Sequence, residues 1–258
     1  MKNKKVIMIM SLVLMFVCFW GNTYVEAGNI KNSEISLKLD NSYHKKIIQE
    51  GNYNIDGKGH LFIQNKDELS EQYVEEIVRV NQLVDMGVGY FNESGEFVSF
   101  DSEDVERNVY NYDKQVKNNE CNIELDATYP RLNAYSIALQ NKNYISGTLQ
   151  ALAAVDPSTA YATTVAIWVA KVKEGGDWDY KNRNGYAPYY KKWNAYQKNI
   201  SAIRTSEWFG NYNYGFTGKV LFSQEALLRG GDAVSYAKNR AKDTPDDKRA
   251  IVQGFYES

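Results

Sequence analysis

Residues 156–181, DPSTAYATTVAIWVAKVKEGGDWDYK, decide the fold of the C-terminal half of the chain. Proline is favoured at the first position of a helix, where its missing N–H leaves no bond unmade, and Asp156 before it is a suitable N-cap. A run of core residues follows, and Gly175-Gly176 ends it because glycine takes the left-handed cap conformation at no steric cost. The stretch therefore predicts a buried helix that begins at Pro157 and ends before the glycines.

The residues after these glycines, DWDYK, are not explained by the end of a helix. Asp177 and Asp179 stand two residues apart and Lys181 follows them. A carboxylic acid of raised pKa beside a cation suits proton transfer and an anionic transition state, and paired carboxylates also hydrolyse glycosidic bonds. The candidate catalytic residues are Asp179, Lys181, Asp177 and, just before the glycines, Glu174.

Two short helices are predicted upstream of this stretch, over residues 129–140 and 144–155, with a polar break between them. Downstream lies SEWFGNYNYGFTGK, residues 206–219, whose asparagines and glycines predict tight turns or a close approach of the backbone to a ligand. The positions concerned are Asn211, Asn213, Gly215 and Gly218. Farther on, TPDD at 244–247 predicts a helix start with a capping box, which competes with a functional role for Asp247.

Aromatic residues are concentrated in the same half of the chain. Four of the five tryptophans lie there among many tyrosines, namely Trp168, Trp178, Trp193 and Trp208. Aromatic rings at this density, mixed with asparagine and glycine, are typical of surfaces that stack on bases or sugar rings. The alternative is a small domain that uses its aromatic residues as a core, which must account for at least half of them.

The N-terminal half is patterned differently. Residues 28–60 are polar and weakly patterned and are predicted to be loosely ordered, whereas residues 66–86 carry apolar residues at helical spacing and stop at Gly87. The segment YFNESGEFVSF, residues 90–100, predicts a hairpin. Residues 101–120 are charge-rich and predict a linker or a surface helix.

The predicted fold is therefore mostly α, and α+β overall. A small α+β region, acidic and partly disordered, is expected at residues 28–128. A basic helical domain is expected at residues 129–258, with its core motifs at 165–258.

The first residues predict a secretory signal peptide at 1–27. A basic start, KNKK, precedes an apolar run at 6–20, and Ala27 is the small residue at which signal peptidase cuts. The run is shorter than the roughly 20 residues that span a bilayer. We therefore expect cleavage after Ala27, a secreted protein without stable membrane insertion, and Cys121 as a single remaining cysteine that is buried as an apolar side chain.

Charge divides the chain after the signal peptide. Residues 28–126 hold ten basic and twenty acidic side chains, a net charge of −10. Residues 127–258 hold seventeen basic and eleven acidic side chains, a net charge of +6. The asymmetry indicates either a polyanionic partner for the basic half or two solvated surfaces that attract each other.

Four motifs occur in order in the last hundred residues or so. They are GGDWDYK at 175–181, NYNYGFTGK at 211–219, LLRGG at 227–231, and Asp247, Ile251 and Gly254 spaced as D-x3-I-x2-G. Together they resemble the bacterial polymorphic toxin type 44 domain (bacterial toxin 44). The resemblance implies a mostly helical toxin domain of interbacterial conflict systems, regarded as a ribonuclease, with a cognate immunity protein as partner.

By position, the resemblance implies functional residues within these motifs. They are Trp178, Asp179, Lys181, Asn213, Tyr214, Gly215, Thr217, Gly218 and Asp247. Of these, Trp178, Asn213, Tyr214, Thr217 and Asp247, together with Asn211, are the candidate substrate-binding residues. The chain departs from the family pattern at Asp177, where proline is common.

The basic half contains no histidine, since His44 and His60 both lie upstream of it. Imidazole acid–base catalysis is therefore excluded from that half. It also lacks the cluster of histidine and cysteine that predicts a zinc site, and two aspartates are a weak signal for Mg²⁺. No cofactor is expected.

Three functions remain open at this point. The resemblance and the basic charge favour cleavage of RNA in a competitor cell, with carboxylates, lysine and arginine in place of histidine. A peptidoglycan hydrolase is the alternative, because it acts where a signal peptide delivers it and can use Glu174 or the aspartates as general acid. A non-enzymatic module that binds a polyanion or a glycan is the third. Charge does not choose between RNA and an anionic wall polymer.

Overall fold

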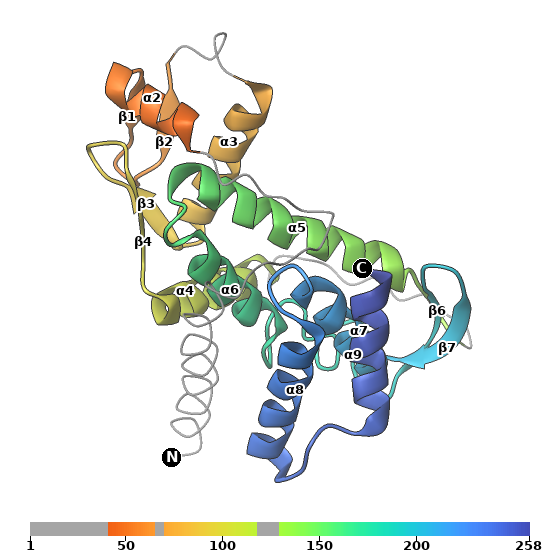
Figure 1. Ribbon diagram of the computed structural model, residues 1–258. Coiled ribbons are helices and arrows are strands. Elements are labelled where there is room, and N and C mark those ends of the chain that lie inside the picture. The colour runs from red at the N-terminus through yellow and green to blue at the C-terminus, as the bar shows by residue number, and fades with distance from the viewer. Residues whose placement is uncertain (1–40, 65–69, 118–128) are drawn as a thin grey trace.

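The computed structural model describes residues 41–64, 70–117 and 129–258 (Figure 1). The predicted signal peptide and Cys121 lie outside the described residues. Within the described ranges the chain is mostly helical with three small sheets, which confirms the predicted class. Of the helices in those ranges, none has the length and apolar character needed to cross a membrane.

The N-terminal part consists of two helices and two antiparallel hairpins. Helix α2 (Ser42–Glu50) precedes strands β1 (Tyr53–Ile55) and β2 (Leu61–Ile63), and helix α3 (Glu71–Asp85) precedes strands β3 (Gly89–Phe91) and β4 (Phe97–Ser99). The predicted amphipathic helix and the predicted hairpin are thereby confirmed. The loose order predicted up to His60 is wrong for residues 41–60, because α2 buries His44 and Ile47 and the strands pair.

Helix α4 (Ser102–Lys117) joins the N-terminal part to the C-terminal part. Of the linker and the surface helix predicted for this segment, the structure has the helix. Its apolar face buries Val105 and Val109 completely. That face packs against helix α6 (Ala160–Val172) of the C-terminal part. The acidic region therefore lies directly against the basic one.

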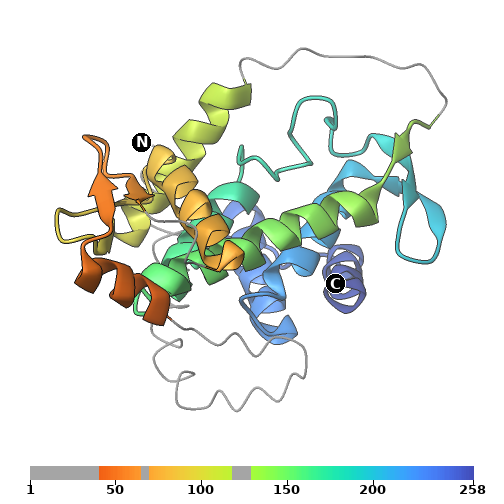
Figure 2. The same cartoon turned by 90° about the horizontal axis from the view of Figure 1, so that it is seen from above.

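The C-terminal part contains one long helix, α5 (Ala134–Val155), which crosses the molecule between the N-terminal elements and the hairpin of β6 (Lys192–Tyr196) and β7 (Ser201–Thr205) (Figures 1 and 2). The predicted break in it is wrong. Asn141, the first residue of the expected break, donates hydrogen bonds to Tyr180 Oη and Asn213 Oδ1, each at 2.9 Å. These partners, distant in sequence, satisfy the polar side chain within a continuous helix.

Helix α6 begins later than the sequence predicted. Its N-cap is Thr159 and not Asp156. The Asp156 carboxylate instead accepts bonds from the backbone N–H of Ser158 at 3.1 Å and from the Ser158 hydroxyl at 2.6 Å. Asp156 thus stabilises a turn before the helix, and the buried face of α6 starts at Ala160.

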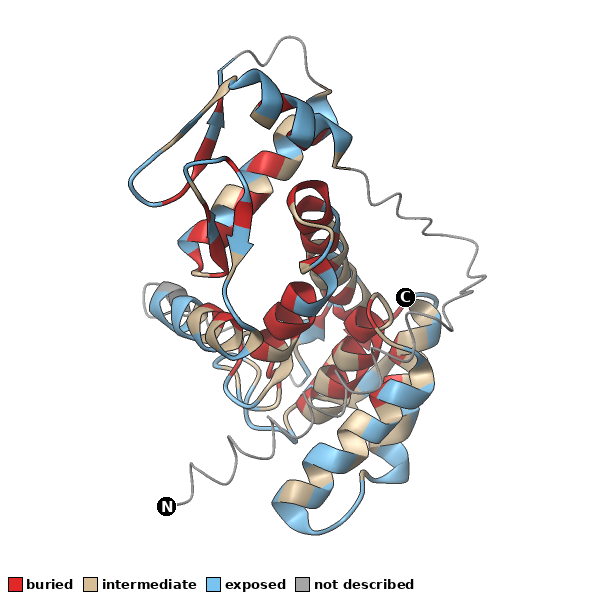
Figure 3. Ribbon diagram, turned by 60° about the vertical axis from the view of Figure 1, so that its left-hand side comes forward, coloured by how far each residue is buried: buried red, intermediate tan, exposed pale blue. Residues whose placement is uncertain are grey.

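The remaining elements close the C-terminal part. Strand β5 (Arg131–Leu132) pairs in parallel with β6 (Lys192–Tyr196), which pairs with β7 (Ser201–Thr205), and helices α7 (Ser206–Gly218), α8 (Gln224–Asn239) and α9 (Pro245–Glu257) follow. The turns expected in residues 206–219 are wrong, because this segment is α7. Buried residues line the facing sides of α5, α6 and α7 (Figure 3).

Candidate functional site

Asp179 organises the loop between α6 and β6. Its side chain is only 8% exposed, and its Oδ2 accepts hydrogen bonds from the Gly175 backbone N–H at 2.8 Å and from Asn182 Nδ2 at 2.9 Å. Gly175 has a φ of +75°, a left-handed conformation that glycine adopts without strain. This carboxylate therefore holds the loop closed on itself, which favours a structural role.

The other residues predicted near Asp179 face different surroundings. Asp177 pairs with Arg183 at 3.4 Å, and the exposed Glu174 pairs with Lys238 of α8 at 2.7 Å. Trp178 is buried, with its ring centroid 6.1 Å from that of Tyr144 on α5. The structure therefore does not bring the candidate carboxylates of this loop together.

The polar residues predicted in α7 lie in the core. Asn213 and Thr217 are fully buried, and Trp168 Nε1 donates to Thr217 Oγ1 at 2.9 Å. The Tyr214 hydroxyl donates to the Leu227 carbonyl oxygen at 3.2 Å, and burial raises the pKa of this phenol above its usual range. These contacts favour a packing role. Asn213 Nδ2 has no hydrogen-bond partner among the described residues, and packing does not explain that orphan group.

The glycines of the motifs leave space for neighbouring groups. A Cβ added at Gly230 would lie within 3.0 Å of the Tyr214 hydroxyl, and one at Gly231 within 3.0 Å of the Asp243 carboxylate. A Cβ at Gly218 would overlap the Leu227 side chain in the same way. The LLRGG motif is therefore the surface of α8 on which two polar side chains of other elements rest.

Lys181 leaves the loop toward α7. A Cβ added at Gly210 would meet Lys181 Cγ at 3.3 Å, so the lysine side chain lies over this glycine. Glu207 precedes Gly210 by three residues and shares its face of the helix. The Glu207 carboxyl group is close enough to feel the charges of Lys181, Asp247 and Asp243.

Asp243 approaches the same place from the connection between α8 and α9. Its Oδ1 is hydrogen-bonded to the Ser235 hydroxyl, and its carboxylate also feels the charge of Lys181. We name Lys181, Glu207 and Asp243 the carboxylate centre. Its three members come from three separate segments of the C-terminal part, and each is partly accessible to solvent.

Asp247 lies beside this centre, but its carboxylate is hydrogen-bonded within the first turn of α9. Its Oδ2 accepts from the Thr244 hydroxyl at 2.7 Å, and Thr244 Oγ1 accepts from the Asp247 N–H at 3.2 Å, which confirms the predicted capping box. The other carboxylate oxygen accepts from Asn211 Nδ2 at 2.5 Å. Both oxygens therefore have protein partners, and the predicted substrate-binding residues Asn211 and Asp247 bind each other.

Burial raises the pKa values of both acids of the centre. For Glu207, burial is the largest cause, Lys181 opposes it, and the negative charges of Asp247 and Asp243 add to it. For Asp243, burial again dominates, the Ser235 hydrogen bond opposes it, and Asp247 adds to the increase. Two carboxyl groups that hold protons more tightly than usual thus lie within electrostatic range of one cation.

The sequence analysis missed Glu207 and Asp243. An acid in the first turn of a helix is already explained by the helix dipole, and Asp243 stands just before a capping box. One signal was available. LLRGG contains two consecutive glycines inside a helix, and such glycines mark positions where another group approaches closely.

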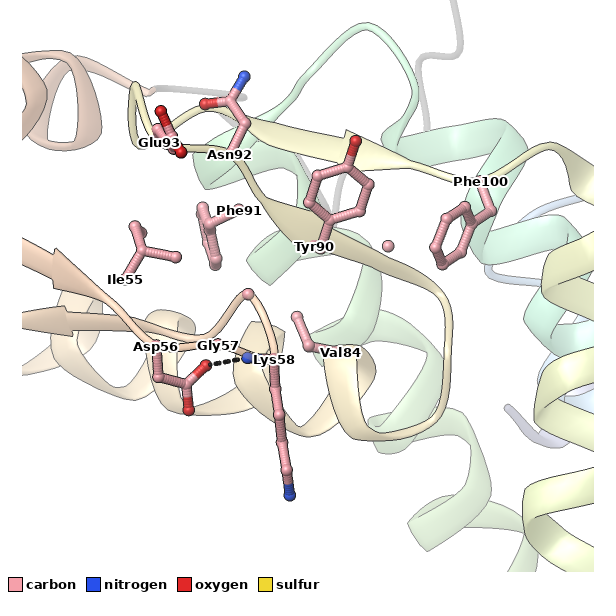
Figure 4. Close-up of a pocket in the computed structure, with 12 residues that line it drawn as sticks. Ile55, Asp56, Gly57, Lys58, Val84, Tyr90, Phe91, Asn92, Glu93 and Phe100 are labelled. Atoms are coloured by element: carbon pink, nitrogen blue, oxygen red, sulfur yellow. Dashed lines mark hydrogen bonds between the residues drawn. The ribbon is translucent and has the colours of Figure 1, made fainter.

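The N-terminal part contains a separate hollow of about 630 Å³ (Figure 4). Tyr90 and Phe100 form one side of it, and Asp56 and Lys58 of the β1–β2 turn form the other. The nearby His60 bonds to Asp56 at 2.8 Å and to Asp85 at 3.2 Å through its two ring nitrogens. Because both nitrogens are engaged, this histidine is a structural tie within the N-terminal part.

A family model described as bacterial toxin 44 matches residues 167–257 of the chain, as the motifs predicted. The match runs from within α6 to the end of α9 and includes the whole carboxylate centre. No curated protein and no solved structure matches the chain. The C-terminal part is therefore similar to a domain of bacterial toxins, and the N-terminal part lies outside the match.

Proposed function

We propose that this chain is a secreted toxin-type hydrolase that cleaves a cell-wall glycan, with Glu207 as general acid. The observation that carries the proposal is the carboxylate centre, in which two partly buried carboxyl groups of raised pKa lie within electrostatic range of a lysine. Glycosidic bonds are cleaved by such a pair, one acid protonating the leaving oxygen and the other acting at the sugar carbon. The similarity to bacterial toxin 44 supports the toxin role.

Glu207 fits the acid role because its raised pKa keeps more of it protonated near neutral pH. Its proton passes to the glycosidic oxygen as the bond from that oxygen to the anomeric carbon breaks. Asp243 supplies the negative charge that stabilises the oxocarbenium-like transition state. Water then adds to the anomeric carbon and gives its proton to the Glu207 carboxylate, which restores the acid. Burial raises the pKa of Asp243, and the Ser235 hydrogen bond and Lys181 oppose that increase and favour its ionised form.

Cleavage of RNA, which the sequence favoured, suits this centre less well. Each RNA linkage carries a phosphate anion, and the carboxylates of Asp243 and Asp247 would repel it when ionised. Both histidines belong to the N-terminal part. The basic charge of residues 127–258 is the observation that keeps RNA as the second candidate.

Location fits the wall better than the cytoplasm. Export through a signal peptide at 1–27 would deliver the enzyme to its substrate, whereas a ribonuclease would still have to enter a target cell. The proposed chemistry uses only side chains of this chain. A producing cell that is itself exposed to the toxin needs protection, and we expect a cognate immunity protein as the partner.

The test compares Glu207→Gln with Glu225→Gln in the full mature chain. Glu225 is an exposed acid on α8 that pairs with Arg229, so its variant controls for loss of one charge. Purified wall sacculi and total cellular RNA are offered separately, and new reducing ends and RNA length are measured. Glu207→Gln should lower wall hydrolysis by about 10²- to 10⁴-fold, and Glu225→Gln should not change it.

Two results would overturn the proposal. One is degradation of RNA with intact sacculi, which would restore the ribonuclease prediction. The other is equal wall hydrolysis by the Glu207→Gln variant and the parent protein. Folding of each variant is checked by its thermal unfolding curve, so that loss of activity is separated from loss of structure.

A further inference from the structure

A second hollow, of about 420 Å³, lies in the C-terminal part beside the first turns of α5. Leu132, Ile137 and the nearly buried Trp193 supply its apolar surface. Polar side chains line the rest, namely Arg131, Asn133, Ser136 and Gln140, together with Tyr186. Its volume lies within the range of small-molecule sites, and its lining combines aromatic rings with side-chain amides.

Arg131 is the charged residue of this hollow. Its guanidinium lies 4.2 Å from the centroid of the Tyr196 ring, and its Nε donates to Asn133 Oδ1 at 3.0 Å. These two contacts hold the side chain in place. The hydrogen bond uses Nε and not the terminal nitrogens of the guanidinium group. No carboxylate belongs to the lining described here, in contrast to the hollow of Figure 4, which includes Asp56 and Glu93.

The wall of this hollow is tied to the carboxylate centre through Ser206. Trp193 Nε1 donates to Ser206 Oγ at 2.7 Å, and the same hydroxyl donates to the Tyr186 carbonyl oxygen at 2.6 Å. The next residue is Glu207, whose backbone N–H donates to the Tyr189 carbonyl oxygen at 2.9 Å. The ring of Trp193 and the backbone of Tyr186 are therefore each joined by one hydrogen bond to the residue that precedes the proposed general acid.

We propose that this hollow is a subsite for a sugar unit that carries an anionic group, bound through Arg131. The proposal rests on the proposed function, because it assigns the hollow to a further unit of the same polymer. Tyr186 and Trp193 provide rings for contact with a sugar, Asn133 and Gln140 provide amides for acetamido or hydroxyl groups, and arginine recognises a carboxylate or a phosphate. The shared chemistry of the ligand is an anion on an N-acetylated sugar.

The experiment measures dissociation constants of three matched sugars for the full mature chain by ligand-observed NMR. The probes are N-acetylmuramic acid, which carries a carboxylate, N-acetylglucosamine 6-phosphate, which carries a phosphate, and neutral N-acetylglucosamine. At least one anionic sugar should bind about tenfold more tightly than the neutral one or better. Arg131→Gln should remove this preference, and Lys192→Gln, on the same sheet but outside the hollow, should retain it.

The outcomes separate this proposal from the proposed function. The carboxylate and phosphate probes tell which group on the wall polymer is recognised, and preference for either supports the subsite. Equal affinity for all three sugars, or a preference that survives Arg131→Gln, overturns it. If Glu207-dependent wall hydrolysis occurs without the preference, only the subsite fails. If the preference occurs without wall hydrolysis, the subsite stands as a binding site and the proposed enzyme fails.

Discussion

Two helix contacts differ in their chemistry, one inside the C-terminal part and one that joins α4 to it. In the contact of α7 with α9, a Cβ added at Gly215 would lie far below 3.0 Å from the Ile251 carbonyl oxygen, and one at Gly254 equally close to that of Tyr212. In the contact of α4 with α6, Lys171 Nζ bonds both oxygens of Asp113, at 2.8 and 2.9 Å. In the α7–α9 contact the two backbones approach each other closely at glycines. In the α4–α6 contact a buried ion pair accompanies the apolar face of α4.

The α7–α9 contact lies within the toxin-like region, whereas the α4–α6 contact attaches the N-terminal part to it. Both helices of the glycine contact lie inside the family match, whereas α4 lies outside it. A second pair, Lys173 with Glu106 at 2.6 Å, repeats the charge chemistry between α4 and the end of α6. Part of the basic excess of the C-terminal half is therefore matched by the acidic half, which favours the sequence alternative of two mutually attracting surfaces.

The largest expected effect comes from Gly254→Ala. Alanine normally stabilises a helix by about 1 kcal/mol relative to glycine, but here its Cβ would overlap the backbone of α7. We expect a net loss of about 4 kcal/mol or more in the free energy of unfolding, since the helices must separate. Chemical denaturation measures it. Gly57→Ala, where the added Cβ meets nothing within 4 Å, is the matched control. A Gly254→Ala protein as stable as the parent would show that the close backbone contact does not exist in solution.

Asp113→Asn tests the charged contact. The side chains of Lys171 and Asp113 are 7% and 11% exposed, so the variant leaves a buried ammonium group without its counter-charge. The expected loss in the free energy of unfolding is about 3 to 5 kcal/mol. The double variant Lys171→Met with Asp113→Leu should recover most of this loss, because it removes both charges together. If the single variant is nearly as stable as the parent, solvent reaches this pair and the contact is a surface one.

Acid should loosen the N-terminal part before the C-terminal part. Burial lowers the pKa of His44 to about 4, and its Nδ1 is hydrogen-bonded to the Tyr73 hydroxyl at 2.8 Å. Since the unfolded chain binds this proton near pH 6.5, the stabilisation by neutral His44 is present above that pH and is lost as pH falls toward 4.

Between pH 7 and pH 5 the expected loss is about 2 kcal/mol. Hydrogen exchange at both pH values locates it, with protection falling first in α2 and α3. His44→Gln should flatten the dependence over this interval. A uniform loss of protection across both parts would mean that the α4–α6 contact makes them one cooperative unit, and would contradict the contrast between the two contacts.

The sequence predicted the elements whose causes are local. Helix α3 follows from its apolar spacing, and the capping box of Thr244 and Asp247 follows from four adjacent residues. The continuity of α5 did not, because Asn141 is satisfied by Tyr180 and Asn213, which are far along the chain. The β6–β7 hairpin was not predicted, because the aromatic residues around it are consistent with either a core or a surface position.

Of the three members of the carboxylate centre, one was a candidate from the sequence. Lys181 was identified from its motif and does lie in the carboxylate centre. Its partners Glu207 and Asp243 come from other segments, and only packing brings the three together. In the sequence, Asp179 is an acid that the end of a helix does not explain, and a catalytic acid has the same appearance. Its bonds to Gly175 and Asn182 are made by the folded loop and are not visible in the spacing.

The smallest expected effect separates the cap from the centre. Thr244→Ala removes the hydroxyl that bonds Asp247 Oδ2 at 2.7 Å, and loss of an N-cap costs about 1 kcal/mol. Because Asn211 still holds the other oxygen of Asp247, the charges around Glu207 should stay in place and wall hydrolysis should change by less than about twofold. Thr244→Ser, which keeps the hydroxyl, is the control for both measurements. A large loss of hydrolysis in Thr244→Ala at full thermal stability would instead give Asp247 a direct part in the reaction, since its Oδ2 would have lost the hydroxyl and kept only the backbone N–H of position 244, which donates to it at 3.3 Å.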